Sequence, residues 1–233
     1  MRRIAVVLSV LLLLCLCVGC GSEVEVQDYQ RLVEVSSVDA RTAVLAEGTL
    51  ELAAQMPDAA WNSLPKWNGI TVPNLQEYGM EYDGQPQVFS REDMENISNL
   101  GFNFVRVPLD TRIFLDWDDP SKVHLEKLVN LDELISWGAA FGTHVCVDVH
   151  SSFGFTTDGD DANDTLWGNP VEQEIFLSFW DMLAERYKEV PNNLLSFNLM
   201  NEPTWGITEE QYVDFMRCTM ERIRVHTPER LMF

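Results

Sequence analysis

The chain has 233 residues, of which 46% are hydrophobic and 23% charged, and its formal net charge is −21. This length and composition are ordinary for a globular chain with a sizeable core, and they exclude a disordered tail. An acidic surface repels nucleic-acid phosphate and anionic lipid, so we expect no nucleic-acid partner and favour neutral or cationic ones.

The first 20 residues have the pattern of an export signal. Arg2 and Arg3 follow the first methionine, and the apolar stretch Ile4–Val18 is short for a membrane span and is followed by small residues. The closing Cys17-Val18-Gly19-Cys20 resembles the leader of bacterial lipoproteins, whose last cysteine is lipidated and becomes the first residue of the mature protein. Cys17 replaces the usual aliphatic residue, and the alternative is a plain secretion signal cut nearby. We expect an exported protein, either secreted or anchored through a lipid on Cys20.

Beyond the leader the chain has two cysteines, Cys146 and Cys218. Cys146 lies between valines in an apolar run and Cys218 in a predicted helix, so we expect two buried small hydrophobic side chains rather than a disulfide. His144 and His150 lie about 20 Å apart along one predicted strand and cannot share a metal. A later acidic loop fits a calcium loop poorly, because Leu166 stands where glycine is needed. The sequence predicts no metal site.

Residues 21–60 show no clean periodic pattern. Glu23–Val26 could form a strand, and Val38–Met56 holds helix-forming residues, but Gly48 interrupts that run. We therefore expect residues 21–60 to be a tether and lead-in before a domain at 61–233.

From Leu64 onward, apolar runs of strand length alternate with stretches of helical periodicity. Four such units in a row, with polar side chains at the strand ends, predict an α/β fold with a parallel sheet. The predicted strands are 66–72, 102–109, 144–149 and 194–201, and the predicted helices begin at Ser90, Val123, Pro170 and Thr208.

Three of these helices begin with the spacing of a capping box, in which two side chains each accept from the other residue's backbone N–H. Gly101 is expected to end the first helix in the left-handed conformation. The three pairs are Ser90 with Asp93, Asn169 with Glu172, and Thr208 with Gln211.

Polar residues collect at the ends of the predicted strands. Arg106 lies near the end of the second, His150 ends the third, and Asn201-Glu202-Pro203 ends the fourth. Because the carboxyl ends of parallel strands meet at one edge, where such folds bind ligands, we expect these side chains to lie together. Arg230–Phe233 indicates the start of a fifth strand. A complete barrel needs about 250 residues or more, so we expect part of a longer barrel.

Three strand-end motifs, Gly101-Phe-Asn-Phe-Val-Arg-Val-Pro108, Val147-Asp-Val-His150 and Asn201-Glu202-Pro203, resemble in this order glycoside hydrolase family 5, which contains cellulases. The resemblance covers residues 64–233 and implies a (β/α)8 TIM barrel, of which about four βα units and the start of strand 5 are present. It also implies a retaining endo-β-glycosidase that acts on a β-1,4-linked polysaccharide or oligosaccharide such as glucan or mannan. The enzyme would need no cofactor and would be a monomer when full length.

The resemblance implies a role for each matched residue. Glu202 would be the general acid and base, and Asn201 would hydrogen-bond the sugar 2-hydroxyl. Arg106 would orient the nucleophilic carboxylate, and His150 would contact a sugar hydroxyl or the catalytic carboxylates. The family's nucleophile is a Glu after the seventh strand, which lies beyond Phe233. We therefore expect this stretch alone to be inactive.

Each of these residues also has an interpretation without catalysis. Glu202 would be an exposed turn residue, Arg106 a structural ion pair, for instance with Asp148, and His150 a histidine whose hydrogen bonds are satisfied. For the whole protein, the alternative function is a catalytically inactive barrel that binds glycan at the cell surface.

The chain has seven tryptophans, which suggests a sugar cleft because flat apolar sugar faces stack on aromatic rings. Trp137 and Trp180 lie on predicted helices and are expected in the core. Trp117, Trp167 and Trp205 lie in loops after strands, and Trp205, three residues past Glu202, is the preferred platform for the substrate.

Overall fold

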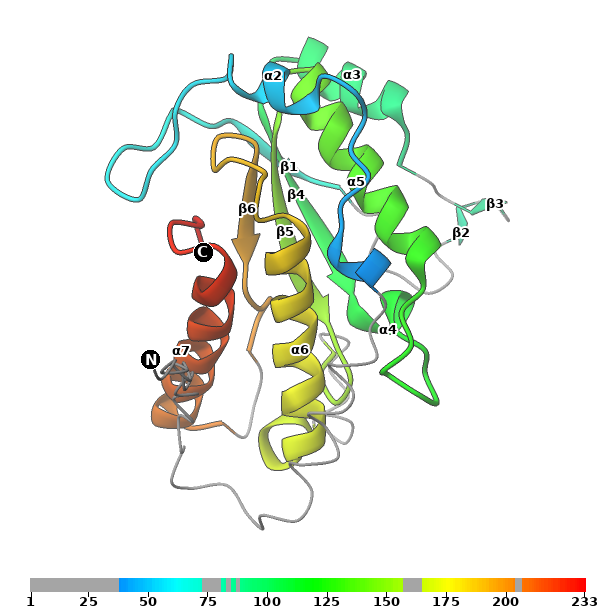
Figure 1. The fold of residues 1–233 in the computed structure, drawn as a ribbon, viewed down its shortest axis with the longest axis vertical. Coiled ribbons are helices and arrows are strands. Elements are labelled where there is room, and N and C mark those ends of the chain that lie inside the picture. Colours follow the sequence, from blue (N-terminus) through cyan, green and yellow to red (C-terminus); the bar gives the residue numbers. More distant parts are fainter. Residues whose placement is uncertain (1–37, 73–80, 83–84, 87–88, 157–164, 204–206) are drawn as a thin grey trace, which may run out of the picture.

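A four-stranded parallel sheet in the order β1-β4-β5-β6 forms the centre of the fold (Figure 1). The computed structural model describes residues 38–72, 81, 82, 85, 86, 89–156, 165–203 and 207–233. The strands of the sheet are β1 Gly69–Thr71, β4 Phe104–Asp110, β5 His144–Ser151 and β6 Leu195–Asn198, and a separate antiparallel pair is β2 Glu81–Tyr82 with β3 Gln85–Pro86. Neighbours in the sheet follow one another in sequence, as in the wall of a barrel.

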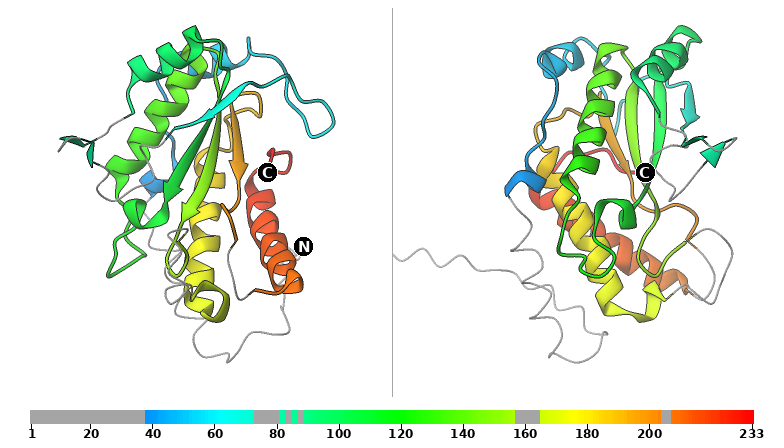
Figure 2. Two further views of the ribbon diagram at one scale, coloured as in Figure 1. Left: turned by 180° about the vertical axis from the view of Figure 1, so that it is seen from behind. Right: turned by 90° about the vertical axis from the view of Figure 1, so that its right-hand side faces the viewer.

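Helices separate the strands of the sheet, and Figures 1 and 2 show that α5, α6 and α7 cover one face of it. The α-helices are α2 Thr49–Ala53, α3 Arg91–Asn99, α4 Thr111–Phe114, α5 Leu125–Ala140, α6 Pro170–Arg186 and α7 Glu209–His226, and the 3-10 helices are η1 Val38–Arg41 and η3 Leu166–Gly168. No helix in the described ranges is long and apolar enough to cross a membrane. The predicted α/β fold with a parallel sheet is confirmed.

The last residues pair with β6 as a fifth strand would. Met232 forms a parallel bridge with Phe197, whose N–H donates to the carbonyl of Leu231 at 3.0 Å. The N–H of Leu199 donates to the carbonyl of Phe233, also at 3.0 Å. In the described ranges, the parallel sheet therefore holds four strands and the start of a fifth, which confirms the predicted partial (β/α) barrel.

The core lies between the sheet and its helices. Alternate residues of a strand point to opposite faces, and the fully buried Val105 and Val107 of β4 and Val145 and Val147 of β5 belong to this core. Trp180 of α6 is also fully buried, and its indole N–H donates to the carbonyl of Leu199. Trp137 is only partly buried against the core.

The helix ends follow the predicted signals with one exception. The capping boxes of Ser90 with Asp93 and of Thr208 with Gln211 are present, and Gly101 has φ 89°. Asn169 caps α6 by accepting from the N–H of Val171, but the predicted box with Glu172 is wrong. The Glu172 carboxylate instead accepts from the hydroxyl of Thr165 at 2.7 Å.

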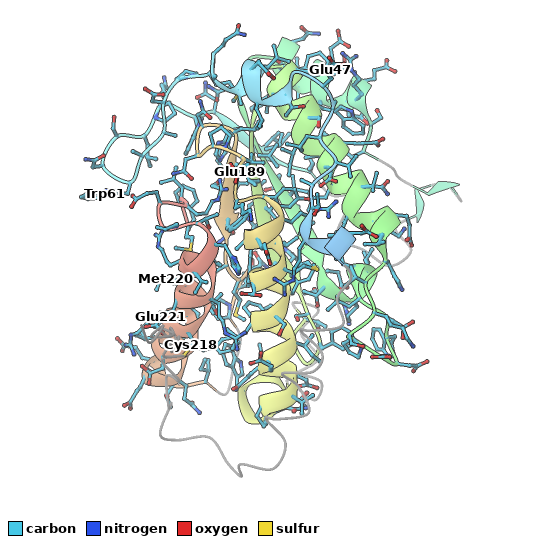
Figure 3. All side chains as sticks on the ribbon, viewed as in Figure 1. Glu47, Trp61, Glu189, Cys218, Met220 and Glu221 are labelled. Carbon is cyan, nitrogen blue, oxygen red and sulfur yellow. The ribbon has the colours of Figure 1, made fainter. Side chains whose placement is uncertain are left out.

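The two cysteines form no disulfide. Cys146 is buried in β5, as predicted, and burial raises the pKa of its thiol to about 11. Cys218 lies on α7 (Figure 3) and is only half-buried, which differs from the buried position that we predicted.

Residues 38–56 are packed onto the helices, which differs from the tether that the sequence suggested. Asp132 and Arg186 form a buried ion pair at 2.5 Å, and Arg186 donates to the carbonyls of Asp39 and Ala40. The Asp132 carboxylate accepts from the N–H of Val44 at 2.7 Å. Residues 21–37 lie outside the described residues.

Gly138 of α5 packs closely against Val145 of β5 and the backbone of Thr143. A Cβ at this position would lie 2.7 Å from both the carbonyl oxygen of Thr143 and a methyl group of Val145. We expect Gly138→Ala to lower the free energy of unfolding by about 1–3 kcal/mol, although alanine favours helix at open positions. Urea denaturation measures this, with Gly168→Ala as the control because no atom lies within 4 Å of its Cβ position. Equal stability of the two variants would contradict the prediction.

Candidate active site

The parallel register places several polar side chains on the face of the sheet opposite the helices. Pro108, Asp148 and Asn198 are neighbours across β4, β5 and β6. Arg106 lies two residues before Pro108, and His150 two residues after Asp148, so each shares the face of its strand neighbour. The sequence therefore gathers these side chains at the carboxyl half of the sheet, which is where barrel enzymes build their sites.

Arg106 contacts three polar side chains, one on β5, one on β6 and one in the segment after β6. Its Nε donates to Oδ1 of Asn198 at 2.9 Å, and its terminal nitrogen donates to Oδ1 of Asn201 at 2.7 Å. The same guanidinium forms an ion pair with Asp148 at 2.8 Å. The structural ion pair that the sequence allowed is thus present, but Arg106 also fixes Asn201, the neighbour of Glu202.

His150 lies between Asp148 and Asn201 and contacts both side chains. Its Nδ1 lies 2.9 Å from Oδ2 of Asp148, and its Nε2 lies 3.4 Å from Nδ2 of Asn201. A carboxylate only accepts, so the proton of the ring is on Nδ1, and Nε2 is free to accept from the Asn201 amide. Asp148, Arg106, Asn201 and His150 therefore form a closed ring of three hydrogen bonds and one ion pair, which we call the polar ring.

Glu202 extends beyond the polar ring. Asn201 is buried, and its backbone N–H donates to the carbonyl of Val149 at 3.0 Å, whereas Glu202 is exposed. Glu202 has φ 39° and is the single non-glycine residue with positive φ in the described ranges. This conformation costs roughly 1–2 kcal/mol, and such strain concentrates at functional sites.

Asn198 belongs to the site although the sequence analysis did not name it, and Asp148 was named only as a possible ion-pair partner of Arg106. Both are polar residues in otherwise apolar runs of the sequence. Asp148 lies two residues before His150, and Asn198 lies three residues before Asn201. Their side-chain contacts depend on the register between strands, which no local pattern gives. Trp205 and Cys20 lie outside the described residues.

A cavity of about 360 Å³ lies beside the polar ring, lined by Trp67, Gly69, Phe104, Arg106, Cys146, Asn198 and Phe233. The ring of His144 lies tilted against Trp67, with ring centroids 4.2 Å apart, and its Nδ1 lies 3.0 Å from the carbonyl of Asn193. Burial lowers the pKa of His144 to about 4. His144 is thus a neutral packing residue. Within the described ranges, no three His, Cys, Asp or Glu side chains are placed to hold a metal ion.

The two other loop tryptophans differ in exposure. Trp117 is 63% exposed and lies against Phe153, with ring centroids 5.7 Å apart. Trp167 packs edge-on against Phe215 of α7 and is partly buried against the core. Of these two, only Trp117 presents a broad aromatic surface.

A wall of parallel βα units with Arg, Asp, His, Asn and Glu gathered at the carboxyl ends of its strands defines a barrel with an enzyme-type polar site. The family model described as cellulase (glycosyl hydrolase family 5) matches residues 65–233. The chain belongs to this family, which confirms the resemblance seen in its strand-end motifs.

The match to each of the following relatives covers only part of that relative's length. Endoglucanase C of Acetivibrio thermocellus is 30% identical over 127 residues, which are 51% of this chain and 36% of that protein. Probable glucan 1,3-beta-glucosidase A of Emericella nidulans is 31% identical over 147 residues, 60% of this chain and 36% of that protein. Thermotoga maritima Cel5A in complex with cellobiose superposes with a TM-score of 0.57 and 26% identity, over 70% of this chain and 49% of that one. The chain thus spans about half the length of this solved structure and less of the two curated relatives.

Proposed function

We propose that this glycoside hydrolase is a retaining endo-β-glycosidase that acts on a β-1,4-linked polysaccharide such as glucan or mannan. The observation that carries the proposal is the polar ring, which holds the Asn201 amide directly before an exposed, backbone-strained Glu202. Endoglucanase C among the relatives supports a glucan substrate.

Glu202 acts as the general acid and base in this proposal. Its carboxyl group gives a proton to the leaving glycosidic oxygen, and its carboxylate then takes a proton from the water that releases the sugar. The retaining reaction needs a second carboxylate about 5–5.5 Å away as nucleophile. Asp148 does not fit that role, because it is fully buried and bonded to Arg106 and His150. The proposal assigns the nucleophile to the part of the barrel that this sequence does not contain.

The other matched residues support the transition state. Asn201 uses Oδ1 for Arg106, and Nδ2 keeps a second hydrogen with which to donate to the sugar 2-hydroxyl. That bond strengthens as positive charge develops on the sugar ring. Arg106 and His150 position this amide, and Trp205 offers a stacking surface for a neighbouring sugar.

The test is an assay of the complete protein on β-1,4-glucan, β-1,4-mannan and β-1,3-glucan. We expect release of reducing ends from a β-1,4-linked substrate and, by proton NMR at early times, products in the β-configuration. Products that first appear in the α-configuration would contradict a retaining reaction. Binding without any release of reducing ends would instead show the inactive glycan-binding barrel.

We also propose that the protein is exported and anchored through a lipid on Cys20, as its leader pattern indicates. We expect the mature protein to partition into the detergent phase, and Cys20→Ser to move it into the aqueous phase or to mislocalise it. Cys218→Ser is the control, because Cys218 lies on α7 and far along the chain from the leader. Recovery of the unmutated protein wholly in the culture fluid, cleaved away from Cys20, would reject the anchor.

A further inference from the structure

The Asp148 carboxylate contacts two residues of the site, Arg106 and His150. Its carboxylate is fully buried, and the single atom Oδ2 both forms the ion pair with Arg106 at 2.8 Å and accepts from Nδ1 of His150 at 2.9 Å. Its other oxygen, Oδ1, is buried and has no hydrogen-bond partner among the described residues. Asp148 therefore ties no other segment of the described fold together.

Asp132 shows how a structural carboxylate differs. Its two oxygens accept from the Arg186 guanidinium, the Tyr187 hydroxyl and the backbone N–H of Val44, and so join three segments. A buried ion costs several kcal/mol to desolvate, and such a cost is recovered through well-made hydrogen bonds. Asp148 leaves one oxygen without such a bond, which points to a task within the polar ring rather than to stability.

The chemistry of the polar ring leaves one arrangement of protons. Arg106 can only donate, so Asn201 must turn Oδ1 toward it and Nδ2 toward His150. Nε2 of His150 must then accept, which requires the ring proton on Nδ1. That proton is the one that Asp148 accepts, so the carboxylate completes a consistent set of donors and acceptors.

We propose that Asp148 is a positioning residue, which fixes the Nδ1–H tautomer of His150 and thereby aims the Asn201 amide at the substrate. Without this carboxylate the proton of His150 is able to move to Nε2, which would then face the Nδ2 donor of Asn201. Two donors repel, and the amide would turn away from His150. The kinetic part of this inference rests on the proposed function, whereas the tautomer of His150 does not.

The experiment compares the complete protein with Asp148→Leu and Asp148→Asn. Leucine has a similar shape and no acceptor, whereas asparagine is able to keep one oxygen at the shared position without its charge. Long-range nitrogen NMR of the His150 ring should show the Nδ1–H tautomer in the unmutated protein and a loss of that preference in Asp148→Leu. On polysaccharide, kcat should fall about 10- to 100-fold with KM changed only a few-fold, because the Asn201 contact strengthens in the transition state. Asp148→Asn should be intermediate in both measurements and serves alone if the leucine variant does not fold.

The matched control is Asp110→Asn. Asp110 is another buried carboxylate at the same end of the sheet, but its partner is Arg112, at 2.6 Å. This control should leave both the tautomer of His150 and kcat unchanged. An unaltered tautomer in both Asp148 variants would overturn the inference, and so would an altered tautomer with unchanged kcat. A protein that hydrolyses no glycan but shows the expected tautomer shift would reject the proposed function and retain the role of Asp148 in setting His150.

Discussion

Glu202→Gln in the complete protein should lower kcat/KM on polysaccharide by about 10²–10⁴-fold, the usual contribution of a general acid and base. Glutamine has the shape of glutamate and bears the same φ of 39° with similar strain, so the fold should be unchanged. The amide has no acidic proton to give to the leaving oxygen. Release of reducing sugar, with circular dichroism to verify the fold, measures the effect.

Substrates with good leaving groups separate this role from a simple loss of binding. An aryl glycoside with an acidic phenol needs little protonation, so its first step should be much less affected by Glu202→Gln. Glu210→Gln is the control, because Glu210 is an exposed residue in the first turn of α7. Full activity of Glu202→Gln on polysaccharide would remove Glu202 from the mechanism.

Arg186→Met should lower the free energy of unfolding by about 3–5 kcal/mol, the usual cost of breaking a buried ion pair from one side. The substitution leaves the Asp132 carboxylate buried without its cation and removes two bonds to the backbone of η1. Urea denaturation of the complete protein measures the change. Part of the loss should come from release of residues 38–41, which limited proteolysis would detect.

Arg217→Met is the control for Arg186→Met. Arg217 and Asp214 form an ion pair at 2.7 Å on α7, with both side chains 56% exposed. Exposed pairs of this kind contribute about 0–1 kcal/mol, so this variant should unfold almost as the parent does. Similar losses in the two variants would show that burial of the Asp132–Arg186 pair carries no special weight.

The order of strands and helices could be predicted from sequence because its signals are local. Ser90 and Thr208 carry their capping partners three residues away, and the strand at 144–149 is a short apolar run. The same locality misled the prediction at Glu172, whose carboxylate accepts from Thr165 of the preceding loop instead of completing a box with Asn169.

Contacts between distant residues were not accessible in this way. Residues 38–41 have no periodic pattern of their own. They are held by Arg186, which donates to the carbonyl of Asp39 from 147 positions further along the chain. Arg106, His150 and Asn201 were predicted to lie together from their strand ends, and the structure brings them together. The shared role of Asp148 depends on which face each strand presents, and therefore on register.

The positive φ of Glu202 also limits how far the thermal stability of this barrel can be raised without loss of activity. Glycine would adopt that backbone conformation without strain, so an engineer who selected for heat resistance alone would be led to replace the residue that we assign to proton transfer. At this position, a substitution that raises thermal stability is expected to lower the catalytic rate. A thermostable version of this enzyme should therefore be sought elsewhere in the fold, with position 202 held constant.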